Sequence, residues 1–65
     1  MPIIRVEMLE GRTVEQKRAC VEGLTKAFIE ACGGRKEVVQ VILTETKTEN
    51  WAFGGQLLSD RASQG

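Results

Sequence analysis

Apolar and polar residues alternate at the start of the chain. Between Pro2 and Leu9, the charged residues Arg5 and Glu7 are separated by apolar residues, which are Ile4, Val6 and Met8. A period of two with many β-branched residues is typical of a half-buried strand. The polar segment 10–12 then interrupts the pattern. We therefore expect a first strand over residues 2–9, followed by a turn.

A helical pattern begins after this turn. Apolar or small residues recur at spacings of three and four, as Cys20, Val21, Leu24, Ala27, Phe28 and Ala31. Thr13 and Gln16 have the spacing of a capping box, in which each side chain satisfies the other residue's backbone N–H. Gly33 can adopt the left-handed conformation that ends a helix. These signals predict a helix from Val14 to Cys32.

A second strand is predicted over residues 38–45, where apolar residues are nearly continuous. Such a run is typical of a strand that is covered on both faces. The order strand, helix, strand predicts a right-handed crossover with parallel strands. One helix covers only one face of a two-stranded sheet, so the C-terminal tail or other subunits must cover the second face.

The C-terminal tail carries two aromatic residues at alternate positions, Trp51 and Phe53. The pair Gly54-Gly55 and a short apolar run follow them. This arrangement predicts a small hairpin or an edge strand bent at the glycines. The two aromatic residues fit either a pocket wall or an interface anchor.

A chain of 65 residues is expected to form one domain, here 1–65. A domain of this size buries only ~60% of its unfolded surface and commonly needs disulfides, metals or self-association. The sequence has no His and two Cys, which disfavours a metal site. Cys20 and Cys32 lie ~18 Å apart along the predicted helix, too far for a disulfide. We expect two buried thiols, no metal, no cofactor and self-association.

Charge is balanced, with nine Lys and Arg against nine Asp and Glu, and the signs alternate along the chain. Nucleic acid is therefore not an expected partner. No apolar run approaches the ~20 residues of a membrane span, and Arg5, Glu7 and Glu10 interrupt the region where a signal peptide needs apolar residues. We expect a cytoplasmic protein that does not engage membranes.

Pro2 is the strongest candidate for chemistry. A small residue after an initiator Met generally permits removal of Met1, which would leave a free prolyl secondary amine at the N-terminus. An α-amino group titrates close to neutral pH, and an apolar pocket with neighbouring cations lowers its pKa further. Such an amine can act as a general base. The alternative is that Pro2 only constrains the backbone, as proline normally does.

Together these segments resemble the 4-oxalocrotonate tautomerase family, of the tautomerase superfamily. The resemblance covers residues 2–58 and rests on the Pro2 strand, Leu9-Glu10-Gly11-Arg12-Thr13, Glu15-Gln16-Lys17, Val41-Ile42-Leu43-Thr44-Glu45, and Trp51 with Gly54-Gly55. It implies an α+β fold in which a β-α-β protomer has parallel strands, one helix on the sheet and a short C-terminal hairpin. It also implies a homohexamer, a trimer of dimers, with active sites at subunit boundaries.

The resemblance further implies an isomerase that moves a proton in an unsaturated 2-keto or 2-hydroxy acid, in the degradation of aromatic compounds. Pro2 would be the general base, and Arg12 would bind the substrate carboxylate through parallel hydrogen bonds. Trp51 would form an apolar wall that excludes water. Leu9 and Phe53 would line the same pocket.

Two departures from the family pattern affect the substrate. Gln40 stands where the family has a second arginine, and Trp51 replaces a smaller aromatic residue. A neutral amide donates a hydrogen bond but cannot neutralise a developing dienolate, and loss of such a donor costs ~2.7–4 kcal/mol of transition-state stabilisation. The missing charge has three candidate sources in a neighbouring subunit, which are Arg5, Arg35 and Arg61.

Two other functions remain open. A related dehalogenase or hydratase uses protonated proline as a general acid, and it requires a carboxylate close to Trp51. Positions 50–56 contain no acidic residue, which disfavours this chemistry. The other alternative is a non-catalytic oligomeric binding module. Retention of Met1 in the native protein would favour the binding module.

Overall fold

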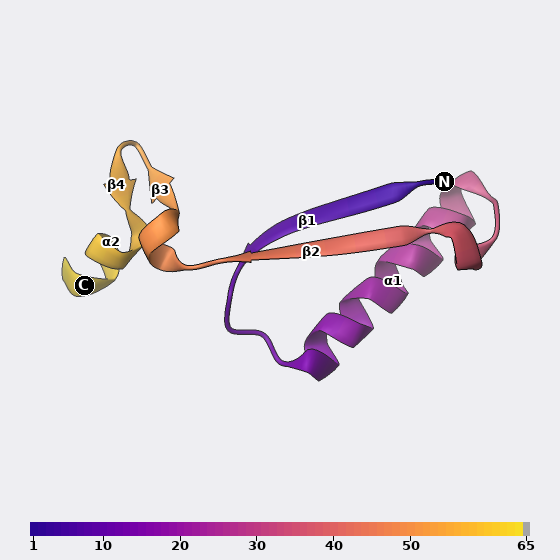
Figure 1. The fold of residues 1–65 in the computed structure, drawn as a ribbon, viewed down its shortest axis with the longest axis horizontal. Coiled ribbons are helices and arrows are strands. Elements are labelled where there is room, and N and C mark those ends of the chain that lie inside the picture. Colours follow the sequence, from indigo (N-terminus) through magenta and orange to yellow (C-terminus); the bar gives the residue numbers. More distant parts are fainter. Residues whose placement is uncertain (65) are drawn as a thin grey trace.

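The computed structural model of the protein describes residues 1–64, with side chains for residues 1–61. In chain order the elements are β1 (Ile3–Leu9), α1 (Val14–Cys32), the 3₁₀ helix η1 (Lys36–Val38), β2 (Gln40–Thr46), the 3₁₀ helix η2 (Thr48–Asn50), β3 (Ala52–Phe53), β4 (Gln56–Leu57) and α2 (Leu58–Gln64). Figure 1 shows this order. The protein has the predicted α+β fold.

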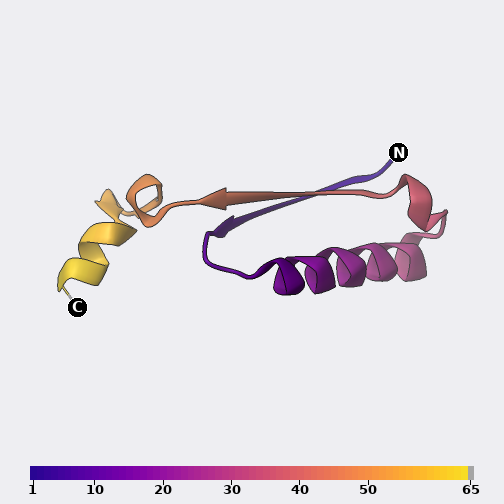
Figure 2. The same cartoon turned by 60° about the horizontal axis from the view of Figure 1, so that its bottom comes forward.

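The two long strands, β1 and β2, are parallel, as the strand, helix, strand order predicts. Their register runs from Ile3 opposite Gln40 to Leu9 opposite Thr46. The helix α1 crosses one face of this sheet (Figures 1 and 2). No element among residues 1–64 covers the other face of the sheet.

The helix α1 has the bounds that the sequence predicts, Val14–Cys32. At its start the amide of Gln16 donates to Oγ1 of Thr13 at 3.1 Å, and the amide of Thr13 donates to Oε1 of Gln16 at 2.9 Å. At its end Gly33 has a φ of 80° and its amide donates to the carbonyl of Ile29 at 2.8 Å. The capping box and the end of the helix at Gly33 are confirmed. The ψ of −174° places Gly33 outside the left-handed helical conformation that was expected, although its positive φ still favours glycine.

The contact between α1 and the sheet consists of half-buried apolar side chains. The sheet contributes Ile4, Val6, Met8, Val41 and Leu43, and the helix contributes Cys20, Val21, Leu24 and Phe28. At the edge of this layer Lys17 forms an ion pair with Glu45. No described side chain is fully buried in the single chain.

Part of the helix face that was predicted to be buried is exposed in the single chain. Ala27, Ala31 and Cys32 are exposed, and only Cys20 of the two free thiols is half-buried. The reason is geometric, because two strands form a sheet too narrow to cover the full apolar arc of a helix. The remaining small side chains therefore face solvent in the monomer.

The strand β2 begins two residues later than the sequence predicts. Val38 ends the 3₁₀ helix η1, and the amide of Val39 donates to the carbonyl of Lys36 at 3.2 Å. Burial along β2 also alternates, with Gln40, Ile42 and Thr44 exposed. No residue in the described part of the chain packs on its second face, so the prediction that both faces are covered depends on another subunit.

The C-terminal hairpin is confirmed. Ala52 of β3 pairs with Leu57 of β4, and Phe53 pairs with Gln56, in an antiparallel ladder. Gly54 and Gly55 have φ values of 54° and 82°. Positive φ at both central residues is the requirement of a type I′ turn, which matches the twist of the strands that it joins.

The sequence did not predict α2. This helix has seven residues, too few for the helical period to emerge from the pattern. The amide of Leu58 donates to the carbonyl of Trp51 at 2.8 Å, which fixes the start of α2 at the base of the hairpin. We call residues 48–61 the hairpin unit.

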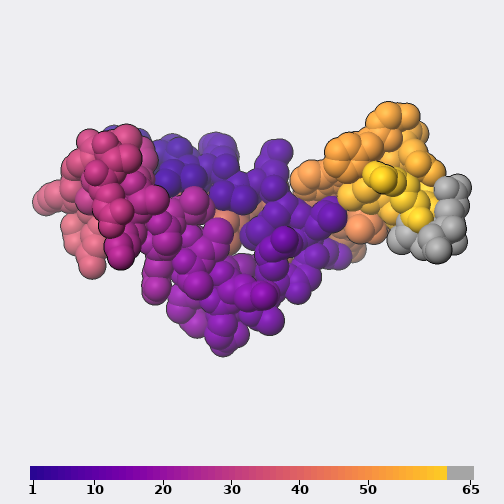
Figure 3. All heavy atoms as spheres, turned by 180° about the vertical axis from the view of Figure 1, so that it is seen from behind, coloured from indigo at the N-terminus to yellow at the C-terminus, as the bar shows by residue number. Residues whose placement is uncertain are grey.

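The chain is extended. Its radius of gyration is 15.4 Å, whereas a compact chain of this length has ~11 Å. Its accessible surface is 5065 Å², whereas a compact monomer of this mass has ~4,100 Å². Figures 1 and 3 show the hairpin unit standing beyond the end of β2, clear of α1. No helix among residues 1–64 is long and apolar enough to cross a membrane.

Candidate active site

Pro2 and Gln40 lie side by side where the two parallel strands begin. The amide of Gln40 donates to the carbonyl oxygen of Pro2 at 3.0 Å. Pro2 is half-buried, and Gln40 is exposed. Met1, which precedes Pro2, is 85% exposed. The structure therefore brings these two predicted site residues together at one end of the sheet.

Leu9 and Arg12 lie at the opposite end of β1. Nη1 of Arg12 donates to the carbonyl oxygen of Leu9 at 3.0 Å. This bond uses one of the several N–H donors of the guanidinium. Because Arg12 is exposed, its other donors remain accessible to a carboxylate.

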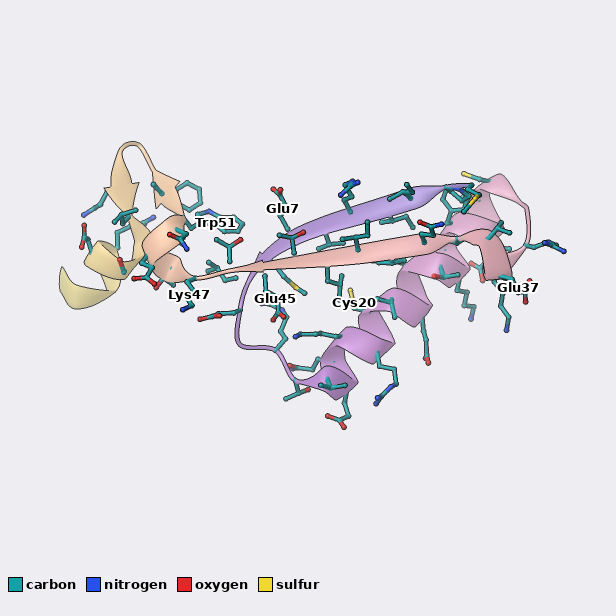
Figure 4. The ribbon with its side chains drawn as sticks, in the orientation of Figure 1. Glu7, Cys20, Glu37, Glu45, Lys47 and Trp51 are labelled. Carbon is teal, nitrogen blue, oxygen red and sulfur yellow. The ribbon has the colours of Figure 1, made fainter. Side chains whose placement is uncertain are left out.

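Trp51 and Phe53 belong to the hairpin unit. The carbonyl of Trp51 accepts from the amide of Leu58, and the amide of Trp51 donates to Thr48 at 3.4 Å. Trp51 is half-buried, whereas Phe53 is 59% exposed. Figure 4 shows Trp51 at the base of the hairpin, beyond the end of β2. More than half of the Phe53 side chain therefore remains exposed in the single chain.

The predicted site residues thus form three separate groups in one chain. Pro2 and Leu9 are seven residues apart along a strand, which corresponds to ~23 Å at 3.3 Å per residue. That distance is several times the length of a small keto acid. The aromatic pair lies further still from Pro2, past the other end of the sheet (Figure 1). A site that uses all three groups must combine residues of different chains.

The uncovered face of the sheet extends from the Pro2 end to the Leu9 end of β1. Ile3 and Ile42 are 51% and 38% exposed on it, and Arg5 and Glu7 occupy the alternate positions of β1 that do not face the helix. In Figure 4 Glu7 points away from α1, whereas Glu45 and Cys20 point into the space between the sheet and the helix. Exposed isoleucines among charged residues are typical of a surface that another subunit covers.

A hollow of about 700 Å³ lies elsewhere, between α1 and η1. It is lined by Val21, Glu22, Thr25, Lys26, Ile29, Glu30, Lys36 and Glu37. None of the predicted site residues contributes to it. Apolar groups make up most of its wall surface, although five of its eight lining residues are charged and both signs are present. Because Pro2 does not line this hollow, it is not the pocket that the predicted chemistry needs.

Comparison with known proteins identifies the class. The tautomerase family, described as "Tautomerase enzyme", matches residues 2–61. A 2-hydroxymuconate tautomerase of Bacillus subtilis (strain 168) is 45% identical over 60 residues, covering 92% of this chain and 97% of that protein. The chain belongs to the tautomerase family, and it is an isomerase.

Solved structures agree with this assignment. One of the 4-oxalocrotonate tautomerase isozymes from Methylibium petroleiphilum is 36% identical with a TM-score of 0.93, covering 98% of this chain and 100% of that chain. A 4-oxalocrotonate tautomerase homologue of the tomaymycin biosynthetic pathway is 42% identical with a TM-score of 0.90, covering 95% of each chain. The predicted family and fold are therefore confirmed.

Proposed function

We propose that this isomerase is a keto–enol tautomerase of unsaturated 2-hydroxy acids, and that Pro2 is its general base. The observation that carries the proposal is the family match, which begins at Pro2 and extends to Arg61. The 45% identical relative named 2-hydroxymuconate tautomerase supports the substrate class. Removal of Met1, which is exposed, gives Pro2 its free amine.

The reaction moves one proton. The neutral amine of Pro2 accepts the proton of the 2-hydroxyl group, electron density shifts along the conjugated chain, and the protonated amine delivers the proton to a carbon. The amine ends in its starting state, so no other reactant is required. A base with a pKa near the working pH is the most effective catalyst for such transfers.

Arg12 and the apolar residues have distinct roles in this proposal. Arg12 binds a substrate carboxylate with the donors that its bond to Leu9 leaves free. Leu9, Trp51 and Phe53 exclude water from the reacting atoms. Exclusion of water favours the neutral form of the Pro2 amine by making its charged form less stable.

The assembly that completes this site is, in our proposal, a homohexamer built as a trimer of dimers. Three observations support self-association: no side chain among residues 1–61 is fully buried, the radius of gyration is 15.4 Å, and the predicted site residues form three separate groups. In an oligomer the Pro2 end of one chain can meet the Arg12 region and the hairpin unit of others.

We also propose a cytoplasmic location and action on a metabolite of aromatic degradation. Two free thiols suit a reducing compartment. The pathway assignment follows from the family alone.

The proposed function is tested by intact mass and activity together. We expect the purified protein to lack Met1 and to convert 2-hydroxymuconate to its unsaturated keto isomer, followed by ultraviolet absorbance. Retention of Met1 in a folded protein without this activity would instead support the non-catalytic binding module. Addition of water or loss of halide from a haloacrylic acid would support the dehalogenase alternative.

A further inference from the structure

The pair formed by Arg61 and Phe53 is not explained by the proposed function. Cζ of Arg61 lies 5.7 Å from the centroid of the Phe53 ring, within the ~6 Å of a cation–π contact. Arg61 belongs to α2, and Phe53 ends β3. Both side chains are exposed. A cation is therefore held on an aromatic residue that is predicted to line the pocket.

Arg61 has no carboxylate partner among residues 1–61. In that range the recorded ion pair joins Lys17 to Glu45, at the sheet. A guanidinium stacked on a ring keeps the N–H groups of its edge available, and these groups match the two oxygens of a carboxylate. Arg61 is therefore positioned to bind an anion and to contact Phe53 at once.

The backbone of the hairpin unit fixes this arrangement. The bond from the Leu58 amide to the Trp51 carbonyl places the start of α2 against the residue before β3. The type I′ turn at Gly54 and Gly55 returns the chain from Phe53 to α2. Trp51, Phe53 and Arg61 consequently belong to one segment whose backbone is held by these hydrogen bonds.

The Pro2 end of the sheet lacks a charge of this kind. Its neighbour is Gln40, a neutral amide. Arg5 lies opposite Ile42, three residues or ~10 Å along the strand from Pro2, and Glu7 follows on the same face. Arg35 precedes η1. Of these three arginines, only Arg61 has a recorded contact with a predicted pocket residue.

We propose that Arg61 binds the carboxylate that Arg12 does not hold, and so selects a dicarboxylate over a monocarboxylate substrate. This inference rests on the proposed function, because it places the hairpin unit in the site. In this arrangement α2 supplies the cation that is absent at position 40. Arg61 contacts the substrate but takes no part in proton transfer.

Kinetics on a matched pair of substrates test the proposal. We expect Arg61→Gln to lower kcat/KM for the dicarboxylate 2-hydroxymuconate about tenfold, mainly through KM, because the variant loses a charge-assisted hydrogen bond to the second carboxylate. The monocarboxylate 2-hydroxypenta-2,4-dienoate should be unaffected. The kcat/KM of Arg61→Lys for the dicarboxylate should lie between the values of wild type and Arg61→Gln. Arg18→Gln, at an exposed position of α1, is the matched control and should leave kcat/KM unchanged for both substrates.

Binding of non-reacting acids gives a second readout that does not need turnover. By calorimetry, wild type should bind muconate more tightly than sorbate, which has the same conjugated carbon chain and one carboxylate. Arg61→Gln should weaken the binding of muconate about tenfold and leave the binding of sorbate unchanged. The oligomeric mass measured by sedimentation should be preserved.

The outcomes separate the two proposals. Equal effects of Arg61→Gln on both acids, or no effect on either, would overturn the role of Arg61 even if tautomerase activity is present. A protein without tautomerase activity that still binds muconate through Arg61 would overturn the proposed function. The same result would support the role of Arg61 in binding a carboxylate.

Discussion

The amide nitrogen of Gln40 lies 3.0 Å from the carbonyl oxygen of Pro2, to which it donates a hydrogen bond. The backbone makes this contact, so it does not depend on the side chain at position 40. Residue 40 is thereby fixed beside the N-terminal residue of the strand. A substitution there can change the charge near the Pro2 amine without changing the strand register.

The first prediction uses this relationship. We expect Gln40→Arg to raise kcat/KM for 2-hydroxymuconate about tenfold, because a guanidinium stabilises the dienolate that a neutral amide does not, and each decade in rate corresponds to ~1.4 kcal/mol. The gain should be smaller for a monocarboxylate enol. Gln40→Met keeps the side-chain length without a hydrogen bond, and it should lower kcat/KM for both the dicarboxylate and the monocarboxylate enol.

Two results would contradict this expectation. A fall in activity on 2-hydroxymuconate after Gln40→Arg would mean that the amide suits a substrate with a smaller or uncharged group at that end. Equal changes for the dicarboxylate and the monocarboxylate would mean that residue 40 does not face the substrate.

The second prediction concerns Pro2. With Met1 removed, Pro2→Ala should lower kcat by ~10²–10⁴-fold, the usual contribution of a positioned general base, since a primary amine differs in basicity and geometry. The oligomeric mass and the circular dichroism spectrum should stay the same. Unchanged tautomerisation would exclude Pro2 as the base. An electrophilic substrate analogue should label residue 2, and labelling of Cys20 or Cys32 instead would indicate thiol chemistry.

The third prediction tests whether the active site is shared between chains. Pro2→Ala and Arg12→Gln should each be nearly inactive alone, because one lacks the secondary amine and the other the carboxylate ligand. If the two variants are unfolded together and refolded as a mixture, mixed oligomers should regain activity at boundaries that carry an intact Pro2 and an intact Arg12. The ~23 Å along β1 gives the physical reason for this complementation.

The control for this experiment is the same mixture combined after separate refolding, which should stay inactive while subunits do not exchange. Absence of recovery in mixed oligomers of confirmed composition would show that Pro2 and Arg12 of one chain serve the same site, contrary to the geometry of the single chain.

The sequence predicted best the elements that local chemistry determines. The ends of α1 follow from the capping box of Thr13 and from Gly33, and the hairpin follows from Gly54-Gly55. These signals act within a few residues and need no partner. The parallel pairing of β1 with β2 follows from connectivity.

The predictions that failed depend on what packs against a residue. Cys32 and Ala31 were expected to be buried, but the single chain gives them nothing to pack on. The helix α2 escaped prediction because a seven-residue helix shows no usable period. The contact of Arg61 with Phe53 spans α2 and β3, and no spacing rule of a single element reveals it. The roles of Pro2, Arg12, Leu9, Gln40, Trp51 and Phe53 remain predictions.

The last prediction concerns the uncovered face of the sheet. Ile42 is 38% exposed there in one chain, and burial of that remaining part between subunits is worth ~0.6–1.1 kcal/mol, which is the corresponding share of the value for a fully exposed side chain. Ile42→Asp would place a charge in each interface of the proposed hexamer, so we expect it to prevent this assembly. Because no side chain in the described part of the chain, residues 1–61, is fully buried, the released subunits should unfold, and stability should depend on protein concentration. Ile42→Val is the matched control and should remain a hexamer of six 7.2 kDa chains. Sedimentation and circular dichroism at the same micromolar concentrations measure both effects, and a folded monomer of either wild type or Ile42→Asp would show that the chain does not need its neighbours.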